Sequence, residues 1–306
     1  MKKSSKTSRK RKKSVIWAAL FCAGCIVMSS CHPARPGGEV SRTDVSAPEV
    51  SSEEGYQSPY HGELGSAGSL SGKTAVISIF TDEAETSWNY ESAEDGRMID
   101  DTLENLGIAT EYLTEQAARF GSDAAFVWDW KENPDLRYTA TFGQSLVTEF
   151  GDMYDVQKDW VLKNIDEQSI KNKYLADNVI YFFFFNTDFS NQVNPWYLGY
   201  SCSPDYYVEF CNIYVRFDDQ FITKPPSYAH EMLHCFGAHD LYYANEFITQ
   251  EYVDHMKAIS SQDIMYMVYD SKDIPCVMTE LDAYYVGILD ECADVTKFNL
   301  APSEHN

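Results

Sequence analysis

The chain has 306 residues, of which 44% are apolar and 14% aromatic, so it is long enough to bury a full hydrophobic core. Eight of its 24 Lys and Arg residues lie within residues 2–13, which leaves 16 basic residues against 47 acidic ones in the rest. Residues 14–306 therefore carry a net charge of −31, and this excludes a nucleic-acid-binding protein because the phosphates would repel it.

The first 31 residues have the pattern of an export signal. Their basic stretch precedes an apolar run from Val15 to Met28, which is shorter than the roughly 20 residues of a membrane span. Cys31 follows two small residues and occupies the place of the lipidated cysteine in a bacterial lipoprotein signal, with Cys25 as a second candidate. Simple cleavage and an uncleaved membrane anchor are the alternatives. Each of them predicts an extracytoplasmic protein, secreted or held at the membrane.

Residues 32–73 are rich in Pro, Gly, Ser and Glu and predict a disordered tether, followed by one domain over residues 74–306. The apolar run Ala75–Phe80 predicts a buried strand. Apolar residues then recur at steps of four and three, which predicts a long amphipathic helix that ends at Gly121. The residues of this stripe are Ile99, Leu103, Leu106, Thr110, Leu113, Ala117 and Phe120.

The middle of the chain alternates between strand and helix patterns. Two strands are expected at Ala124–Trp130 and Arg137–Phe142, around a turn that contains Asn133-Pro134. A helical stretch follows over about Val147–Asn164. The run VIYFFFF at Val179–Phe185 is apolar on both faces and is typical of a central strand.

The next strand pattern, Tyr206–Phe217, allows two interpretations: a sheet edge to which an extended peptide docks, or one arm of an ordinary hairpin. Pro225-Pro226 then opens a helix, because proline is tolerated in a first helical turn. A polar helix at about 245–258, a turn at 260–267 and an apolar helix at about Thr279–Leu289 complete the chain. The order predicts an α/β (α+β) domain with a mainly helical C-terminal part.

The helix after the two prolines carries the motif HEMLHCFGAHD, which starts at His230. On a helix His230 and His234 lie one turn apart on the same face, so both imidazoles can bind one zinc ion. Glu231 projects beside them, where it can take a proton from a water molecule. Gly237 can adopt a positive φ, end the helix and return the chain, so that Asp240 supplies a third ligand. A bare HExxH occurs by chance in on the order of 1% of chains of this length.

Together these residues resemble the signature of the metzincin clan of zinc peptidases, in its HExxHxxGxxD form. The clan also has a methionine turn beneath the metal, and DIMY places Met265 there. The resemblance implies a twisted mixed sheet with long helices above the active-site helix. It also implies that a tyrosine after the methionine, Tyr266 or Tyr269, stabilises the oxyanion, although either phenol can equally be core packing. His239 stands one place before the third ligand, and the spacing favours Asp240.

The predicted function is that of a zinc-dependent endopeptidase acting on extracellular peptides or proteins. One alternative is a gluzincin, in which Glu251 (with Asp254 three residues later) replaces Asp240 as the third ligand. Another is a non-catalytic zinc-containing surface lipoprotein, such as an adhesin, with His239 as a fourth ligand, since structural zinc sites are closed by four protein ligands. An intact Glu231 argues against this last alternative.

Export permits disulfides, and five cysteines follow the signal. Cys202 and Cys211 flank a segment that returns on itself and are one candidate pair, and Cys276 with Cys292 is a second. Cys235 lies within the metal motif and is expected to be buried on the rear face of its helix. Because five is odd, at least one thiol is left free or pairs between chains.

Overall fold

The computed structural model describes residues 65–146, 153–188, 209–218 and 221–303. The predicted signal segment, Cys31 and most of the predicted tether lie outside these residues. Within the part that is described, no helix combines the length and the apolar character needed to cross a membrane.

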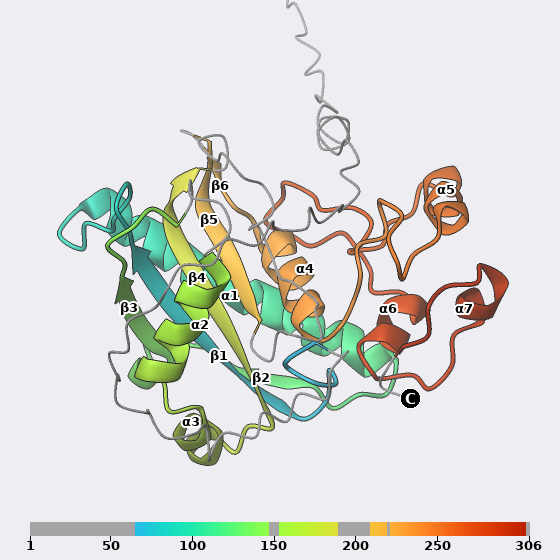
Figure 1. Ribbon diagram of the computed structural model, residues 1–306, viewed down its shortest axis with the longest axis horizontal. Helices are drawn as coiled ribbons and strands as arrows, with labels where there is room; N and C mark the ends of the chain where they lie inside the picture. The colour runs from blue at the N-terminus through green and yellow to red at the C-terminus, as the bar shows by residue number, and fades with distance from the viewer. Residues whose placement is uncertain (1–64, 147–152, 189–208, 219–220, 304–306) are drawn as a thin grey trace, which may run out of the picture. The chain divides into compact units, whose positions relative to one another are not determined.

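The described residues form a mixed α/β structure built on a six-stranded sheet (Figure 1). Its strands are β1 (Lys73–Asp82), β2 (Ala125–Val127), β3 (Arg137–Thr141), β4 (Asn178–Asp188), β5 (Phe210–Asp218) and β6 (Phe221–Ile222). Their order is β2-β1-β4-β5-β6, with β3 also paired to β1. All pairs are parallel except the β5–β6 pair, which is antiparallel.

The helices divide between the faces of this sheet and the C-terminal part of the chain. They are α1 (Ala93–Arg119), α2 (Met153–Asn164), α3 (Glu167–Tyr174), α4 (Pro225–Cys235), α5 (Gln250–Ala258), α6 (Glu280–Tyr285), α7 (Ala293–Lys297) and the short 3-10 helix η2 (Pro134–Leu136). The sequence patterns missed α3 and α7, which are short and polar. The predicted helix at about 279–289 ends earlier, at Tyr285.

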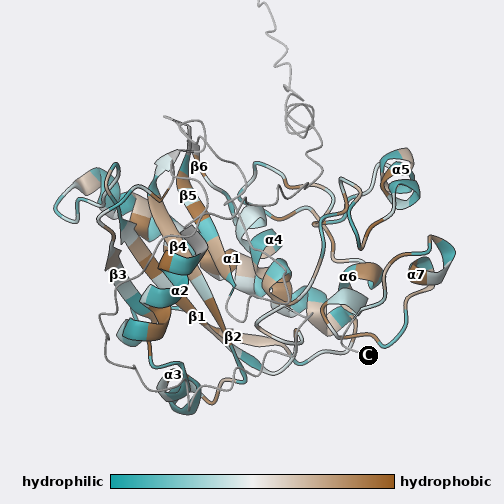
Figure 2. Cartoon of the chain, in the orientation of Figure 1, coloured by the Kyte–Doolittle hydropathy of each residue, from teal (hydrophilic) through white to brown (hydrophobic). Residues whose placement is uncertain are grey.

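Strand β4 is the central strand, as its sequence predicts, and its aromatic side chains reach both layers of helices. Phe182 and Phe184 have their ring centroids 5.9 and 6.0 Å from the ring of Tyr228 in α4. Phe183 points to the opposite face and meets Trp160 of α2 edge-on at 6.3 Å. Neighbouring residues of a strand alternate between its faces, so a strand covered on both sides is apolar throughout. Figure 2 shows this hydrophobic colour along the strands of the sheet.

Helix α1 confirms the predicted amphipathic stripe, since Ile99, Leu103, Leu106 and Leu113 are all buried. The helix packs against α4, the helix that carries the HEMLH motif. Gly121, with a φ of +88°, lies just beyond its C-terminal end, as expected for a helix-ending glycine.

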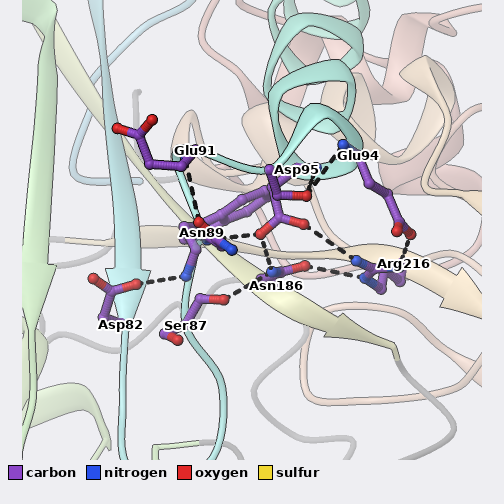
Figure 3. A network of polar contacts seen from close by, with 10 residues as sticks. Asp82, Ser87, Asn89, Glu91, Glu94, Asp95, Asn186 and Arg216 are labelled. Carbon is purple, nitrogen blue, oxygen red and sulfur yellow. Dashed lines mark hydrogen bonds and ion pairs between the residues drawn. The ribbon is translucent and has the colours of Figure 1, made fainter.

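A polar network ties the N-terminal end of α1 to strands β4 and β5 (Figure 3). The guanidinium of Arg216 in β5 lies 3.1 Å from Glu94 and 3.6 Å from Asp95. Its Nε also donates to the side-chain oxygen of Asn186 in β4 at 3.0 Å, and the Asn186 amide donates to Asp95 at 2.9 Å. Because Asp95 is buried, these partners compensate its lost hydration. These contacts fix the N-terminal end of α1 against strands β4 and β5.

Strand β5 corresponds to the predicted strand at Tyr206–Phe217. It pairs with β4 on one side, and near its C-terminal end Arg216 and Asp218 pair with β6 on the other. The outer edge of β5 is therefore already occupied there, and β6 provides the arm of a hairpin at that end. Residues 206–208 lie outside the described part of the chain.

The predicted tether is too long at its C-terminal end. Residues 65–72 are packed on the domain: Ala67 and Leu70 are buried, and the Ala67 N–H donates to the carbonyl of Cys235 at 2.9 Å. The Ser66 hydroxyl accepts from the backbone N–H of Glu209 at 3.0 Å. Small residues gave this segment the composition of a linker, yet their small size is what allows the chain to lie against the end of α4.

Replacing Gly65 with alanine is expected to destabilise the fold by about 1–3 kcal/mol, because a methyl group there overlaps the carbonyl oxygen of Cys235. Gly96 in α1 is the matched control, since nothing lies within 4 Å of a methyl group added there. Gly96→Ala should stabilise the helix by up to about 1 kcal/mol. Urea unfolding of both variants measures the difference, and equal midpoints would show that residue 65 is not packed.

Candidate metal centre

Helix α4 brings the two motif histidines together on one face. Pro225 and Pro226 occupy its first turn, where the missing N–H groups cost no helical hydrogen bond. The imidazole rings of His230 and His234 have centroids 4.7 Å apart, and their Nε2 atoms are separated by 3.1 Å. Both rings are buried, each about 5% exposed. The i, i+4 spacing therefore delivers two nitrogen donors to one point.

Gly237 ends the helix and turns the chain back, as its position predicts. Its φ is +103°, its N–H donates to the carbonyl of His234 at 2.7 Å, and the next N–H, of Ala238, donates to Leu233 at 3.0 Å. These two bonds form the Schellman arrangement that commonly closes a helix with glycine. The returning chain places Asp240 Oδ1 3.1 Å from the Nε2 of His230 and 3.3 Å from that of His234.

Backbone carbonyls orient both imidazoles. The Nδ1 of His230 lies 3.0 Å from the carbonyl oxygen of Ile264, and the Nδ1 of His234 lies 2.8 Å from that of Ala238. Because a carbonyl only accepts, each Nδ1 carries the hydrogen, and the Nε2 lone pair of a neutral ring faces Asp240. Metal-bound histidines are typically held in this way through the other ring nitrogen.

The three donor atoms fit a tetrahedral metal ion. His230, His234 and Asp240 form a potential metal-binding cluster, with one ligand atom from each lying within 4.8 Å of the others. Ligand atoms about 2.0–2.2 Å from a tetrahedral zinc ion are about 3.3–3.6 Å apart, close to the observed separations of 3.1, 3.1 and 3.3 Å. Two imidazole lone pairs and a carboxylate at this distance repel one another unless a proton or a metal cation lies among them.

The pKa values of His230 and Asp240 reflect the close approach of their donor atoms. Burial lowers the pKa of His230, but the hydrogen bond that the protonated ring donates to Asp240 and the charges of Glu231 and Asp240 outweigh burial and raise that pKa to about 9. Burial raises the pKa of Asp240, but the two histidines bring it well below its usual range. The carboxylate of Asp240 thus stays ionised, and a cation beside it is favoured.

Glu231 lies next to the cluster without joining it. Its Oε2 atom is buried and has no hydrogen-bond partner among the described residues. Burial raises the pKa of the Glu231 carboxyl, with the two histidines opposing the shift. An acceptor oxygen without a partner, beside a cation site, is available to take a proton from a water molecule.

The alternative ligands lie elsewhere. His239 is stacked on Phe247 with ring centroids 4.0 Å apart and meets Tyr285 edge-on at 4.8 Å. Burial lowers the pKa of His239 to about 3, so the ring is a neutral part of this aromatic packing. Glu251 is exposed on α5. Neither residue belongs to the three-residue cluster found among the described residues.

The predicted methionine turn lies against the cluster through its backbone. Met265 is fully buried, and its carbonyl accepts from the N–H of Leu241, the residue after Asp240, at 3.0 Å. The preceding residue, Ile264, supplies the carbonyl that orients His230. The turn therefore contacts the first donor, His230, directly and also contacts Leu241, the residue after the third donor.

A buried pair of acids supports this turn. Asp263 Oδ1 accepts from the N–H of Met265 at 2.6 Å, and Asp282 of α6 accepts from the N–H of Thr279 at 3.0 Å. Both carboxyls are buried. Burial, followed by the charge of Asp263, raises the pKa of Asp282 well above its usual value, which favours the protonated form of this carboxyl. The sequence contains no local sign of this pairing.

Two tyrosines follow the donors in sequence, and the structure places them differently. Tyr266 is half-buried in the methionine turn, where its N–H donates to the carbonyl of Asp263 at 3.2 Å. Tyr242, two residues after Asp240, is half exposed. Burial, then the charge of Asp240, raises the pKa of the Tyr242 hydroxyl above its usual value.

The predicted pairing of Cys276 with Cys292 is wrong, because both are free thiols and Cys276 donates to the carbonyl of Met267 at 3.2 Å. Cys202 lies outside the described residues, so the other predicted pair is not seen. Its candidate partner, Cys211, has its sulfur 3.5 Å from that of Cys235, and both are buried free thiols. Cys235 is buried, as predicted, on the side of α4 that faces β5.

Comparison with known proteins adds no assignment to this geometry: no protein-family model matches the chain, and no curated protein sequence matches it.

Proposed function

We propose that this chain is a zinc-dependent endopeptidase that hydrolyses peptide bonds of extracellular peptides or proteins. The observation that carries the proposal is the convergence of three donors, His230, His234 and Asp240, beside the unpartnered Oε2 atom of Glu231. Three protein ligands leave a fourth position free for water, as in catalytic zinc sites, whereas structural zinc sites have four protein ligands. The packing of His239 against Phe247 argues against its being a fourth ligand.

In the proposed mechanism the protein holds the donors and moves the proton. Zinc, when bound, supplies a Lewis acid that lowers the pKa of water and polarises the scissile carbonyl. Glu231 accepts the proton of the attacking water through Oε2 and then donates it to the leaving amine. His230 and His234 keep their lone pairs directed at the site because their Nδ1 atoms donate to Ile264 and Ala238.

We assign the chain, as part of the same proposal, to the metzincin clan. A parallel sheet precedes the motif helix, a glycine with positive φ closes that helix, and a buried methionine lies in a turn bonded to the returning chain. We further propose that the domain acts outside the cytoplasm and is anchored through Cys31, which lies outside the described residues. The net charge of −31 over residues 14–306 favours cationic substrates, because opposite charge speeds encounter.

A peptide-library assay with and without a chelator tests this function. The purified chain is expected to cleave internally quenched peptides, to fall to background with 1,10-phenanthroline, and to recover when zinc is restored. Because non-chelating 1,7-phenanthroline has the same size and aromatic character, it should leave cleavage unchanged and thus serves as the matched control. Cleavage that survives complete removal of metal contradicts the proposal, as does a zinc-loaded chain that cleaves none of the peptides.

A further inference from the structure

Two buried cysteines meet where helix α4 packs on strand β5 (Figure 1). The sulfur of Cys211 in β5 lies 3.5 Å from the sulfur of Cys235, the last residue of α4. Their side chains are 0% and 1% exposed. Neither cysteine belongs to the three-donor cluster found among the described residues, so the proposed mechanism gives these two thiols no task.

The backbone geometry of both elements brings the two sulfurs into one interface. Cys211 is opposite Phe182 in the register of β4 and β5, so the two side chains lie on the same face of the sheet. On that face the ring of Phe182 lies 5.9 Å from the ring of Tyr228 in α4. Cys235 follows Tyr228 by seven residues, which is two helical turns, and therefore lies on the same side of α4.

We propose that Cys211 and Cys235 form a disulfide bond that joins α4 to β5 in the exported protein. Disulfide sulfurs are about 2.05 Å apart, so the two atoms have to approach by about 1.5 Å, which rotation of both side chains supplies. The two thiols lose two protons and two electrons as the S–S bond forms. The disulfide of an oxidant, such as oxidised glutathione or a thiol oxidase, takes them up and becomes two thiols. Because both sulfurs are buried, this exchange takes place while the chain folds.

The bond attaches the C-terminal end of α4 to the sheet, one residue after the donor His234. It joins residues 24 positions apart in the chain and so restricts the unfolded state, which stabilises the fold. The inference rests on the proposed export, because disulfides persist in oxidising compartments, and it is independent of the proposed peptidase activity. It gives Cys211 a different partner from Cys202, and it leaves Cys276 and Cys292 as thiols.

A peptide map of the full chain tests the bond. The chain is refolded from urea with oxidised and reduced glutathione, its remaining thiols are alkylated, and it is digested with chymotrypsin. This protease cleaves after aromatic residues, which separate Cys202, Cys211 and Cys235 from one another in the sequence. Mass spectrometry should find the Cys211 peptide linked to the Cys235 peptide, and a reductant should release both. A Cys211 peptide linked to Cys202 overturns the inference, as does alkylation of both Cys211 and Cys235.

Two alanine variants and the urea midpoint provide a second measurement. The oxidised wild type should unfold at higher urea than the same protein with a phosphine reductant. Cys235→Ala should lose this dependence on the reductant. Cys276→Ala is the matched control, since Cys276 is also a buried free thiol, and it should keep both the dependence and the linked peptides. If Cys235→Ala does not fold, the peptide map of the wild type decides alone. A linked pair in a zinc-loaded chain that cleaves no peptide would refute the proposed function and support this inference.

Discussion

Replacing Glu231 with glutamine is expected to lower peptide hydrolysis by about 10²–10⁴-fold while zinc binding is retained. Glutamine has nearly the shape of glutamate, so it fits the same half-buried place on α4. The amide cannot accept a proton from water at neutral pH, and the unpartnered Oε2 atom that we assign this task is lost or neutralised. Zinc remains because Glu231 is not one of the three donors.

The measurement pairs the rate of cleavage of a fluorogenic peptide with the zinc content of the same sample. Glu251→Gln is the matched control: the same chemical change on an exposed residue of α5 should leave both quantities at wild-type values. If Glu231→Gln cleaves peptide as fast as the wild type, the proposed proton transfer is wrong. If it loses zinc as well, Glu231 contributes to metal binding and the assignment of three ligands is wrong.

The second large effect is expected at the third donor. Asp240→Ala should weaken zinc binding by more than about 100-fold, because it removes a direct ligand, whereas changes to outer partners already cost about 10–100-fold. The variant also leaves the His230 and His234 nitrogens 3.1 Å apart with no carboxylate beside them. Peptide hydrolysis should fall together with zinc content, and high zinc should restore part of both.

Two further alanine variants distinguish the competing ligand sets for this prediction. Glu251→Ala should bind zinc normally, whereas a gluzincin-type site would lose the metal. His239→Ala should also keep its zinc, although it should unfold at lower urea because His239 packs between Phe247 and Tyr285. If Glu251→Ala loses zinc and Asp240→Ala keeps it, the third ligand is Glu251 and the assignment of Asp240 is wrong.

Several features of the fold were predictable because they depend on local periodicity. The stripe from Ile99 to Ala117 identified α1, and the run of phenylalanines identified β4 as the central strand. A helix repeats every 3.6 residues and a strand every two, so burial leaves a periodic trace in the sequence. The boundaries were less accurate: the predicted tether extended into residues 65–72, because small residues are compatible both with a linker and with close packing.

Partner choice between distant segments was not predictable in this way. The suggested bond between Cys276 and Cys292 does not form, and the sulfur atoms that approach each other belong to Cys211 and Cys235, 24 residues apart. Cysteine spacing carries no information on which strand and helix will meet. The same holds for Asp263 and Asp282, two buried acids from separate elements, where burial and then the charge of Asp263 raise the pKa of Asp282.

The sequence by itself determined the parts of the candidate site that lie along one helix and its end. His230 and His234 had to share a face, and Gly237 was free to adopt the positive φ that ends α4, because both follow from backbone geometry. Only the tertiary structure decided that Asp240 faces the imidazoles while His239 packs among aromatic rings. Beyond a helix end, side-chain direction depends on what the loop packs against, and here this includes a turn whose Ile264 carbonyl is 34 residues from His230 in the chain.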